Sequence, residues 1–332
     1  MEYRKLEIDI KNKKFSPVYI LHGEEPYFID QITQLICNHA LEEHEKDFNQ
    51  HIVYGRDADL LSIVSELKGY PMMAERRLVV IREAQDFKDL EELEEYIASP
   101  CETSVLVIAH KYKGINGNKK IIKNTKKTGV IFKSDKVRDY KLGEWIVSFL
   151  RKAGYQINSK GSMLLAEHIG NDLSRMTNEL NKLMDILDKG TQITEVHIEE
   201  NIGISKDYNV FELINAIGDG DINKANQIIY YFNSNPKAAN PVAIVGSIFN
   251  FFTQLMKIHF IKNKSRENIA SELKLHPFIA GKLLQSSRRF SSRKIAENIE
   301  ILYEYDLMTK GVSYSHSDKG PLMKELIFKI LY

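Results

Sequence analysis

The sequence contains few cysteines, no long uninterrupted apolar run and almost no net charge. Only two of its 332 residues are cysteines, Cys37 and Cys101, which excludes a disulfide framework and favours a reducing cytoplasm. No run approaches the roughly 18 apolar residues that span a bilayer, and the charged N-terminal stretch has no signal-peptide core, so no membrane partner is expected. The net charge of +1 gives the whole chain no electrostatic attraction to nucleic acid, so any such attraction must be local.

The first 140 residues alternate between strand-like and helix-like segments. The strand-like runs lie at residues 17–21, 49–54, 77–84, 103–110 and 129–135. The runs that begin at 77 and 103 are apolar on successive residues, which is typical of strands covered on both faces. Between the runs, apolar residues recur at helical spacing, as at Ile29, Ile32 and Ile36. The alternation predicts an α/β domain with a mainly parallel five-stranded sheet over residues 1–140.

From residue 141 onward the pattern is helical, and no strand pattern of any length returns. Apolar residues with helical spacing begin with the stripe Leu142, Trp145, Ile146, Phe149 and Leu150. We predict a small, lid-like helical domain at 141–207 and a longer helical domain at 208–332. The segment 233–241, NSNPKAANP, is the clearest internal loop of the longer domain. The expected fold class is therefore α/β followed by all-α, in three domains.

A glycine between the run at 17–21 and the next helix raises the question of a phosphate loop. A working loop needs the pattern G-x-x-x-x-G-K-[ST], whose backbone N–H groups, lysine and hydroxyl bind phosphates and magnesium. The sequence supplies Gly23, Glu24, Glu25 and Pro26, without the second glycine, the lysine or the hydroxyl. Two carboxylates would face a triphosphate, and Pro26 has no N–H to donate. We interpret the segment as a degenerate phosphate loop that does not bind nucleotide, with its glutamates favourable near a helix N-terminus.

Six segments in order resemble the delta subunit of the bacterial DNA polymerase III clamp loader. They are HGEEPYFID (22–30), GYPMMAERRLVVIREA (69–84), TNELNKLMDILDKGTQIT (177–194), DYNVFELINAIGDGDINKA (207–225), LHPFIAGKLL (275–284) and RRFSSRKIAENIEILYEYDLMTKG (288–311). The resemblance implies an AAA+-like shape for the first two domains. It implies for the third a place in a pentameric collar with the tau/gamma and delta-prime subunits.

The resemblance also implies a function in DNA replication. The delta subunit holds one face of the ring-shaped sliding clamp, the beta subunit, and traps an opened interface through which DNA enters the ring. ATP is used by the tau/gamma subunits. No intrinsic catalysis and no cofactor are therefore expected of this chain, which would act as one subunit of the DNA polymerase III holoenzyme.

Within PMMAERR, the resemblance implies two adjacent apolar side chains at the tip of a helix that enter a hydrophobic pocket of the clamp. By position these are Met72 and Met73. Long, unbranched side chains adapt well to a pocket, and Pro71 would help to fix their entry angle. The pattern alone also allows both methionines to be ordinary core residues. Arg76 and Arg77 have two readings, pairing with acidic groups at the clamp rim or capping the helix C-terminus.

The stretch 119–138 holds eight basic residues against one aspartate. Its candidate DNA-contacting residues are Lys119, Lys120, Lys123, Lys126 and Lys127. Such a stretch can bind phosphates by counterion release, but a solvated surface explains the charges equally well. A second basic cluster consists of Arg288, Arg289, Arg293 and Lys294. There Phe290 and Ile295 indicate the start of a packed helix, which favours collar contacts or solvent.

Two other functions stay open from the sequence. A nucleotide-hydrolysing switch of the same fold would need a phosphate site that residues 22–30 do not offer. A nucleic-acid-binding adaptor would use the basic stretch 119–138. No metal site is expected, because among Cys37, His39 and His44 only the first and last would share one face of a helix.

Overall fold

The structure, a computed structural model, describes residues 3–205, 207–235, 238, 240–275, 277–312 and 320–332. The chain divides into two compact units, residues 1–137 and 138–332, and each is described by itself. The division into three domains stays a prediction.

The first unit is built around a sheet of five parallel strands in the order β2-β3-β4-β1-β5. The strands are β1 (Val18–Gly23), β2 (Gln50–Tyr54), β3 (Arg77–Arg82), β4 (Ser104–His110) and β5 (Val130–Ser134). The α-helices are α1 (Tyr3–Lys11), α2 (Pro26–His39), α3 (Lys46–Asn49), α4 (Leu60–Lys68), α5 (Glu94–Ala98) and α6 (Lys120–Thr128). Short 3-10 helices are η1 (Glu43–Glu45), η2 (Ala84–Asp86) and η3 (Leu90–Leu93). The predicted α/β fold with a mainly parallel five-stranded sheet is confirmed. The AAA+-like shape stays a prediction.

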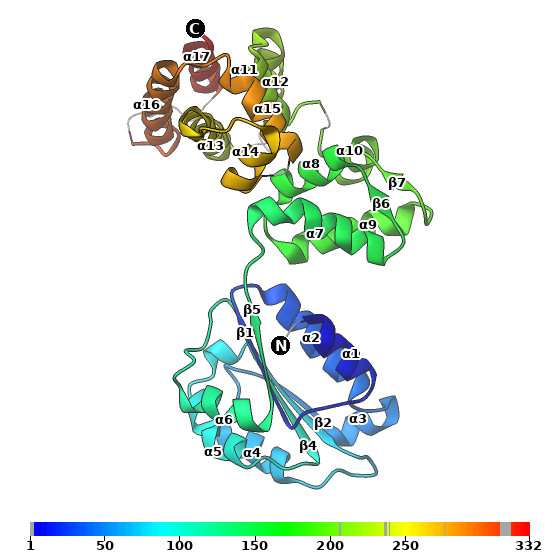
Figure 1. The fold of residues 1–332 in the computed structure, drawn as a ribbon. Coiled ribbons are helices and arrows are strands. Elements are labelled where there is room, and N and C mark those ends of the chain that lie inside the picture. The colour runs from blue at the N-terminus through cyan, green and yellow to red at the C-terminus, as the bar shows by residue number, and fades with distance from the viewer. Residues whose placement is uncertain (1–2, 206, 236–237, 239, 276, 313–319) are drawn as a thin grey trace. The chain divides into compact units, whose positions relative to one another are not determined.

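Helices cover both faces of this sheet (Figure 1). One face packs against α1 and α2, and the other packs against α4, α5 and α6. Successive strand residues enter opposite cores, so that in β4 Val107 faces α2 while Leu106 and Ile108 face the second layer. This is why β4 is buried along its whole length and reads as a continuous apolar run.

The five predicted strands all form, with small differences at their ends. Strand β1 extends two residues beyond the predicted 17–21, and the run predicted at 77–84 is two residues too long, because β3 ends at Arg82. Glu83 has a φ of +49°, a left-handed conformation that cannot continue a strand. The apolar pattern could not reveal this, because the turn depends on contacts of Glu83 elsewhere in the unit.

The second unit is helical apart from two two-residue strands, β6 (Gln156–Ile157) and β7 (Gln192–Ile193), which pair in parallel. Sequence analysis predicted no strand here, because a strand of two residues leaves no periodic signal. The first helices are α7 (Asp139–Lys152), α8 (Ser159–Ile169), α9 (Leu173–Ile186) and α10 (Glu195–Ile202). They are followed by α11 (Val210–Asp219), α12 (Ile222–Ser234), α13 (Pro241–Phe260), α14 (Arg266–Leu273), α15 (Pro277–Ser287), α16 (Ser292–Thr309) and α17 (Gly320–Leu331).

Two hydrophobic clusters form inside this unit. One joins α7 to α10, and the other joins α11 to α17. The loop predicted at 233–241 corresponds to the connection between α12 and α13, of which residues 236, 237 and 239 lie outside the described residues.

Helix α13 is the most apolar long helix of the second unit among the described residues. Although it contains no uninterrupted apolar run of roughly 18 residues, this 20-residue helix is long and apolar enough to cross a membrane by length and composition. Seven of its side chains are buried in the cluster of α11 to α17; they are Ile244, Val245, Ile248, Phe251, Phe252, Leu255 and Ile258. Its apolar character is therefore accounted for by packing as a core helix.

Candidate functional site

The segment from Gly23 to Pro26 forms a tight turn and the start of a helix, as predicted. Strand β1 ends at Gly23 and α2 begins at Pro26, so two residues connect them. Glu25 caps the helix, because its carboxylate accepts a hydrogen bond from the backbone N–H of Tyr27 at 3.1 Å. Glu24 is exposed, whereas Glu25 is buried. A connection this short cannot wrap a phosphate with successive backbone N–H groups.

The turn is also closed against the end of β5. The backbone N–H of Glu25 donates to the carbonyl oxygen of Ser134 at 3.3 Å, and Ser134 Oγ donates to the carbonyl oxygen of Glu25 at 2.6 Å. A Cβ placed on Gly23 would lie 2.0 Å from the Ser134 carbonyl oxygen. Gly23 has a φ of +144°, which side chains rarely adopt. Backbone therefore occupies the space beside the glycine.

A loop after β4 folds back over the same edge of the sheet. Lys113 forms an antiparallel bridge with Gly23, and the N–H of Ile115 donates to His22 Nδ1 at 3.1 Å. The neighbouring His110 is hydrogen-bonded through Nδ1 to the carbonyl oxygen of Lys113 at 3.0 Å. Both histidines are buried. Ligands of open parallel sheets bind at the carboxyl ends of the strands, and here the chain itself covers that position between β1 and β4.

At this edge the buried Lys111 is paired with two partly exposed carboxylates. Its Nζ lies 2.7 Å from Asp30 Oδ1 on α2 and 2.7 Å from Glu83 Oε1 after β3. Burial opposes the charge of Lys111, but its bonds to Asp30 and Glu83 outweigh burial and raise its pKa. The carboxylate of Glu83, which follows a strand end, is therefore already paired. Lys111 was not among the predicted site residues, because nothing in its local pattern shows that two carboxylates converge on it.

Acidification is expected to destabilise the first unit through His22 and His110. Burial lowers the pKa of both side chains below the ordinary value of 6.5. The unfolded chain then binds protons that the folded chain does not. Stability is therefore complete above about pH 6.5 and falls as the pH drops toward the lowered pKa values. Urea unfolding between about pH 7.5 and about pH 5.5 should show this fall, at most about 1.4 kcal/mol per pH unit for each histidine.

The paired variant His22→Gln/His110→Gln supplies the control for that measurement. Whatever its overall stability, its free energy of unfolding should depend less on pH within this window. An unchanged slope would contradict the assignment to these two histidines.

Met72 and Met73 lie in a loop between α4 and β3, so their predicted place at the tip of a helix is wrong. Residues 70–76 are not helical. Gly69 is extended, with a φ of −69° and a ψ of 145°, and ends the helix. Pro71 further disfavours helical conformation at the residue before it.

The reading of these methionines as core residues is also wrong. The exposed fraction is 57% for Met72 and 99% for Met73. Tyr70 is 88% exposed, whereas Ala74 packs against the cluster beneath α1 and α2. The loop therefore presents apolar side chains to solvent, an arrangement that suits a contact with another protein.

Arg76 and Arg77 are held within the unit. Arg77 begins β3, and its guanidinium is hydrogen-bonded to the Glu66 carboxylate in the last turn of α4. This bond goes to a side-chain carboxylate and not to a carbonyl group at the helix end, so the capping reading of Arg77 stays a prediction. The Arg76 guanidinium lies over the ring of Phe15, 4.8 Å from its centroid. Contact of either arginine with the clamp stays a prediction.

The five lysines proposed for DNA contact separate into two groups. Lys119 Nζ lies 2.5 Å from Glu91, and Lys120 Nζ lies 3.1 Å from Glu94, so both are paired with acidic side chains. The other three project from α6; they are Lys123, Lys126 and Lys127, all exposed and without an ion pair among the described residues. Sequence could not separate the groups, because the acidic partners come from a different segment.

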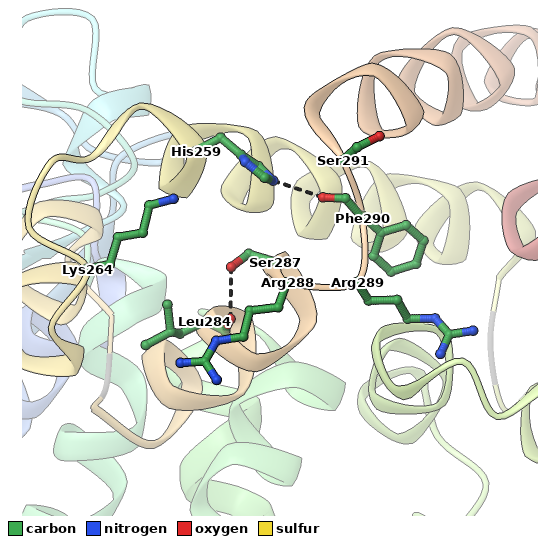
Figure 2. A pocket seen from close by; sticks show the side chains of 8 residues that line it. All are labelled: His259, Lys264, Leu284, Ser287, Arg288, Arg289, Phe290 and Ser291. Carbon is green, nitrogen blue, oxygen red and sulfur yellow. Dashed lines mark hydrogen bonds between the residues drawn. The ribbon is translucent and has the colours of Figure 1, made fainter.

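The second basic cluster surrounds the start of α16, and Phe290 and Ile295 are buried there as predicted. A pocket of about 530 Å³ lies here. Its lining residues, drawn in Figure 2, are His259, Lys264, Leu284, Ser287, Arg288, Arg289, Phe290 and Ser291. His259 Nε2 is hydrogen-bonded to the carbonyl oxygen of Phe290 at 2.9 Å, and Arg289 Nη1 donates to that of Asp219 at 3.3 Å. These basic groups therefore tie helix ends together.

The sequence comparison of Cys37, His39 and His44 assumed a single helix. In the structure α2 ends at His39, and His44 lies in η1. Among the residues that the structure describes, no group of three or more His, Cys, Asp or Glu side chains is arranged to hold a metal ion.

Two family models match the chain. Residues 19–135 match the model of the DNA polymerase III delta subunit, and residues 207–330 match the model of its C-terminal domain. Together the two matches cover well over half of the sequence.

Individual relatives agree along the whole length. The chain is 25% identical to the DNA polymerase III subunit delta of Bacillus subtilis, with 97% of this chain and 95% of the relative covered. Its fold is similar to the solved structure of the B. subtilis DNA clamp loader delta protein, with a TM-score of 0.58 and 24% identity. That match covers 99% of both chains.

Proposed function

The chain belongs to the family of DNA polymerase III delta subunits, and on this premise we propose that it grips the ring-shaped sliding clamp through Met72 and Met73 and opens it. The chain then holds one interface of the ring open, and primed DNA enters through it. The chain itself hydrolyses no ATP and carries no cofactor. As a clamp-loader subunit it takes part in DNA replication.

The observation that carries this proposal is the exposure of Met73, at 99%, in a loop whose neighbouring residues are tied to the unit. An exposed, unbranched apolar side chain on a held backbone is suited to enter a hydrophobic pocket. Met72, 57% exposed, lies beside it and enlarges the apolar area.

The closed turn at Gly23 supports the proposal that this chain acts on the clamp without binding a nucleotide itself. Ser134 is hydrogen-bonded to both the backbone N–H and the carbonyl oxygen of Glu25. The Glu83 carboxylate is already paired with Lys111. A nucleotide-hydrolysing switch would have to break these contacts before phosphates could reach the backbone. Conformational energy for loading therefore comes from other subunits, for which we propose tau/gamma.

We further propose that residues 208–332 join the collar with the tau/gamma and delta-prime subunits. DNA is contacted through the assembled complex, and Lys123, Lys126 and Lys127, which are exposed, are candidate residues for contact with phosphates. Arg76 and Arg77 are secondary clamp contacts at most, since both are held internally. The complex works in the cytoplasm, at the nucleoid when assembled, and without a membrane partner.

The test measures how fast the purified chain alone releases the clamp from circular DNA. Labelled clamp is loaded onto nicked circles, the loader is removed, and release is followed by gel filtration in the absence of ATP. The chain is expected to accelerate release and to show no ATP hydrolysis or tight ATP binding.

The outcomes separate the three functions. Acceleration without nucleotide supports the proposal, and its absence with a folded chain contradicts it. Tight ATP binding would favour the nucleotide-hydrolysing switch. Strong DNA binding with a steep salt dependence, unchanged by substitutions at Met72 and Met73, would favour the nucleic-acid-binding adaptor.

A further inference from the structure

The loop that carries Met72 and Met73 is tied to a distant segment by one side chain. The backbone N–H of Met72 donates to Asn49 Oδ1 at 2.7 Å, and Asn49 Nδ2 donates to the carbonyl oxygen of Met72 at 2.9 Å. Asn49 is the last residue of α3, and β2 and α4 lie between it and the loop in the sequence. Its Nδ2 also donates to the carbonyl oxygen of Glu45 at 2.9 Å. One amide therefore joins α3 to the loop.

This arrangement uses the full donor set of an asparagine. A carboxamide offers two N–H donors and a carbonyl acceptor, and here they meet two carbonyl groups and one N–H. Aspartate at this position would turn an oxygen toward the carbonyls of Met72 and Glu45. Alanine would leave all three backbone groups without these bonds. Asn49 is 1% exposed, so water cannot readily replace its amide.

The adjacent Met73 has a conformation that its own side chain does not stabilise. Its φ is +53°, a left-handed value that is unfavourable for residues other than glycine. Its side chain is almost fully exposed, so packing of that side chain cannot compensate. The backbone is instead held on both sides, by Asn49 at Met72 and by the packing of Ala74 against the core.

We propose that Asn49 is a positioning residue for clamp binding, which holds the loop in the shape that presents Met72 and Met73 before the clamp arrives. The inference rests on the proposed function. A loop held in its binding conformation loses less conformational freedom on association. When a smaller fraction of molecules holds that conformation, the apparent affinity falls by that fraction.

The test measures clamp binding without ATP for Asn49→Ala, in the wild-type chain and in the Met72→Ala/Met73→Ala chain. In the wild-type background, Asn49→Ala should weaken binding about tenfold, mainly through the association rate. In the double-alanine background it should change binding less than about twofold, since there is no longer an apolar contact to position. Asn49→Asp should behave like Asn49→Ala.

Matched controls separate positioning from general damage. Asn201→Ala removes a comparable side-chain bond, from Nδ2 to the carbonyl oxygen of His197 at 2.8 Å, and should leave clamp binding unchanged. Circular dichroism and urea unfolding check the fold of each variant. If Asn49→Ala does not fold, Asn49→Ser, which keeps one hydroxyl donor and acceptor, carries the same comparison.

Three outcomes would overturn the inference, and they differ in what else they overturn. Equal weakening in both backgrounds would make Asn49 a structural residue only. Unchanged binding by a folded Asn49→Ala chain, with binding lost by Met72→Ala/Met73→Ala, would remove the positioning role and leave the proposed function intact. Failure of the wild-type chain to bind the clamp would remove both.

Discussion

Replacing Met72 and Met73 together by alanine is expected to weaken binding of the sliding clamp at least about tenfold, or about 1.4 kcal/mol. Burial of two such side chains is worth roughly 3–6 kcal/mol before ordering costs, so the loss can be considerably larger. The purified chain is titrated with labelled clamp in the absence of ATP, and the dissociation constants of wild type and variant are compared.

The fold should survive this change, because Met73 is 99% exposed and Met72 is 57% exposed. Circular dichroism and the urea midpoint should therefore match those of the wild type. Phe260→Ala is a suitable control, since that side chain is 80% exposed in the second unit and its removal takes away a comparable apolar surface. Equal clamp binding by wild type and double variant would place the contact elsewhere on the chain.

A second large effect is expected from Gly23→Ala, which should lower the free energy of unfolding by at least about 3 kcal/mol. The new Cβ would meet the Ser134 carbonyl oxygen at 2.0 Å, and the φ of +144° is unfavourable for alanine. Gly23 and Ser134 are paired residues of the adjacent strands β1 and β5. Neither backbone can move away from the new Cβ without breaking this pairing. Urea unfolding measures the loss.

Gly154→Ala provides the matched comparison. Gly154 also has a positive φ, of +87°, but nothing lies within 4 Å of the position of an added Cβ. Its substitution should cost only the backbone strain, about 1 kcal/mol. A loss at Gly23 no larger than the loss at Gly154 would mean that the turn opens easily. In that case the closed turn would no longer argue against a phosphate ligand.

Much of the fold could be predicted from the sequence, because the apolar pattern reflects local burial. Strands buried on both faces, such as β4, read as continuous apolar runs, and the helical stripe at Leu142 to Leu150 matches α7. The absence of a phosphate-loop lysine and hydroxyl was equally readable, since these groups must stand at fixed positions in the chain. The segments that resemble the delta subunit also led to the family that the comparisons support.

Properties that depend on contacts between distant segments were not readable. Apolar residues such as Met72 and Met73 are found in cores as well as on surfaces. Their exposure follows from the end of α4 before Gly69 and from the hydrogen bonds of Asn49 to Met72. The sequence did not distinguish Lys119 and Lys120 from the lysines that follow them, because their partners Glu91 and Glu94 come from another segment.

The sequence thus indicated the fold class, the absence of the phosphate-loop lysine and hydroxyl, and the resemblance to the family, because each depends on which residue types stand at which positions along the chain. The folded chain established which side chains can meet a partner. It closed the turn at Gly23 with Ser134, paired Lys111 with two carboxylates and left Met73 in solvent. Exposure and pairing are set by segments that lie far apart in the sequence and meet in the folded unit, so no local pattern records them.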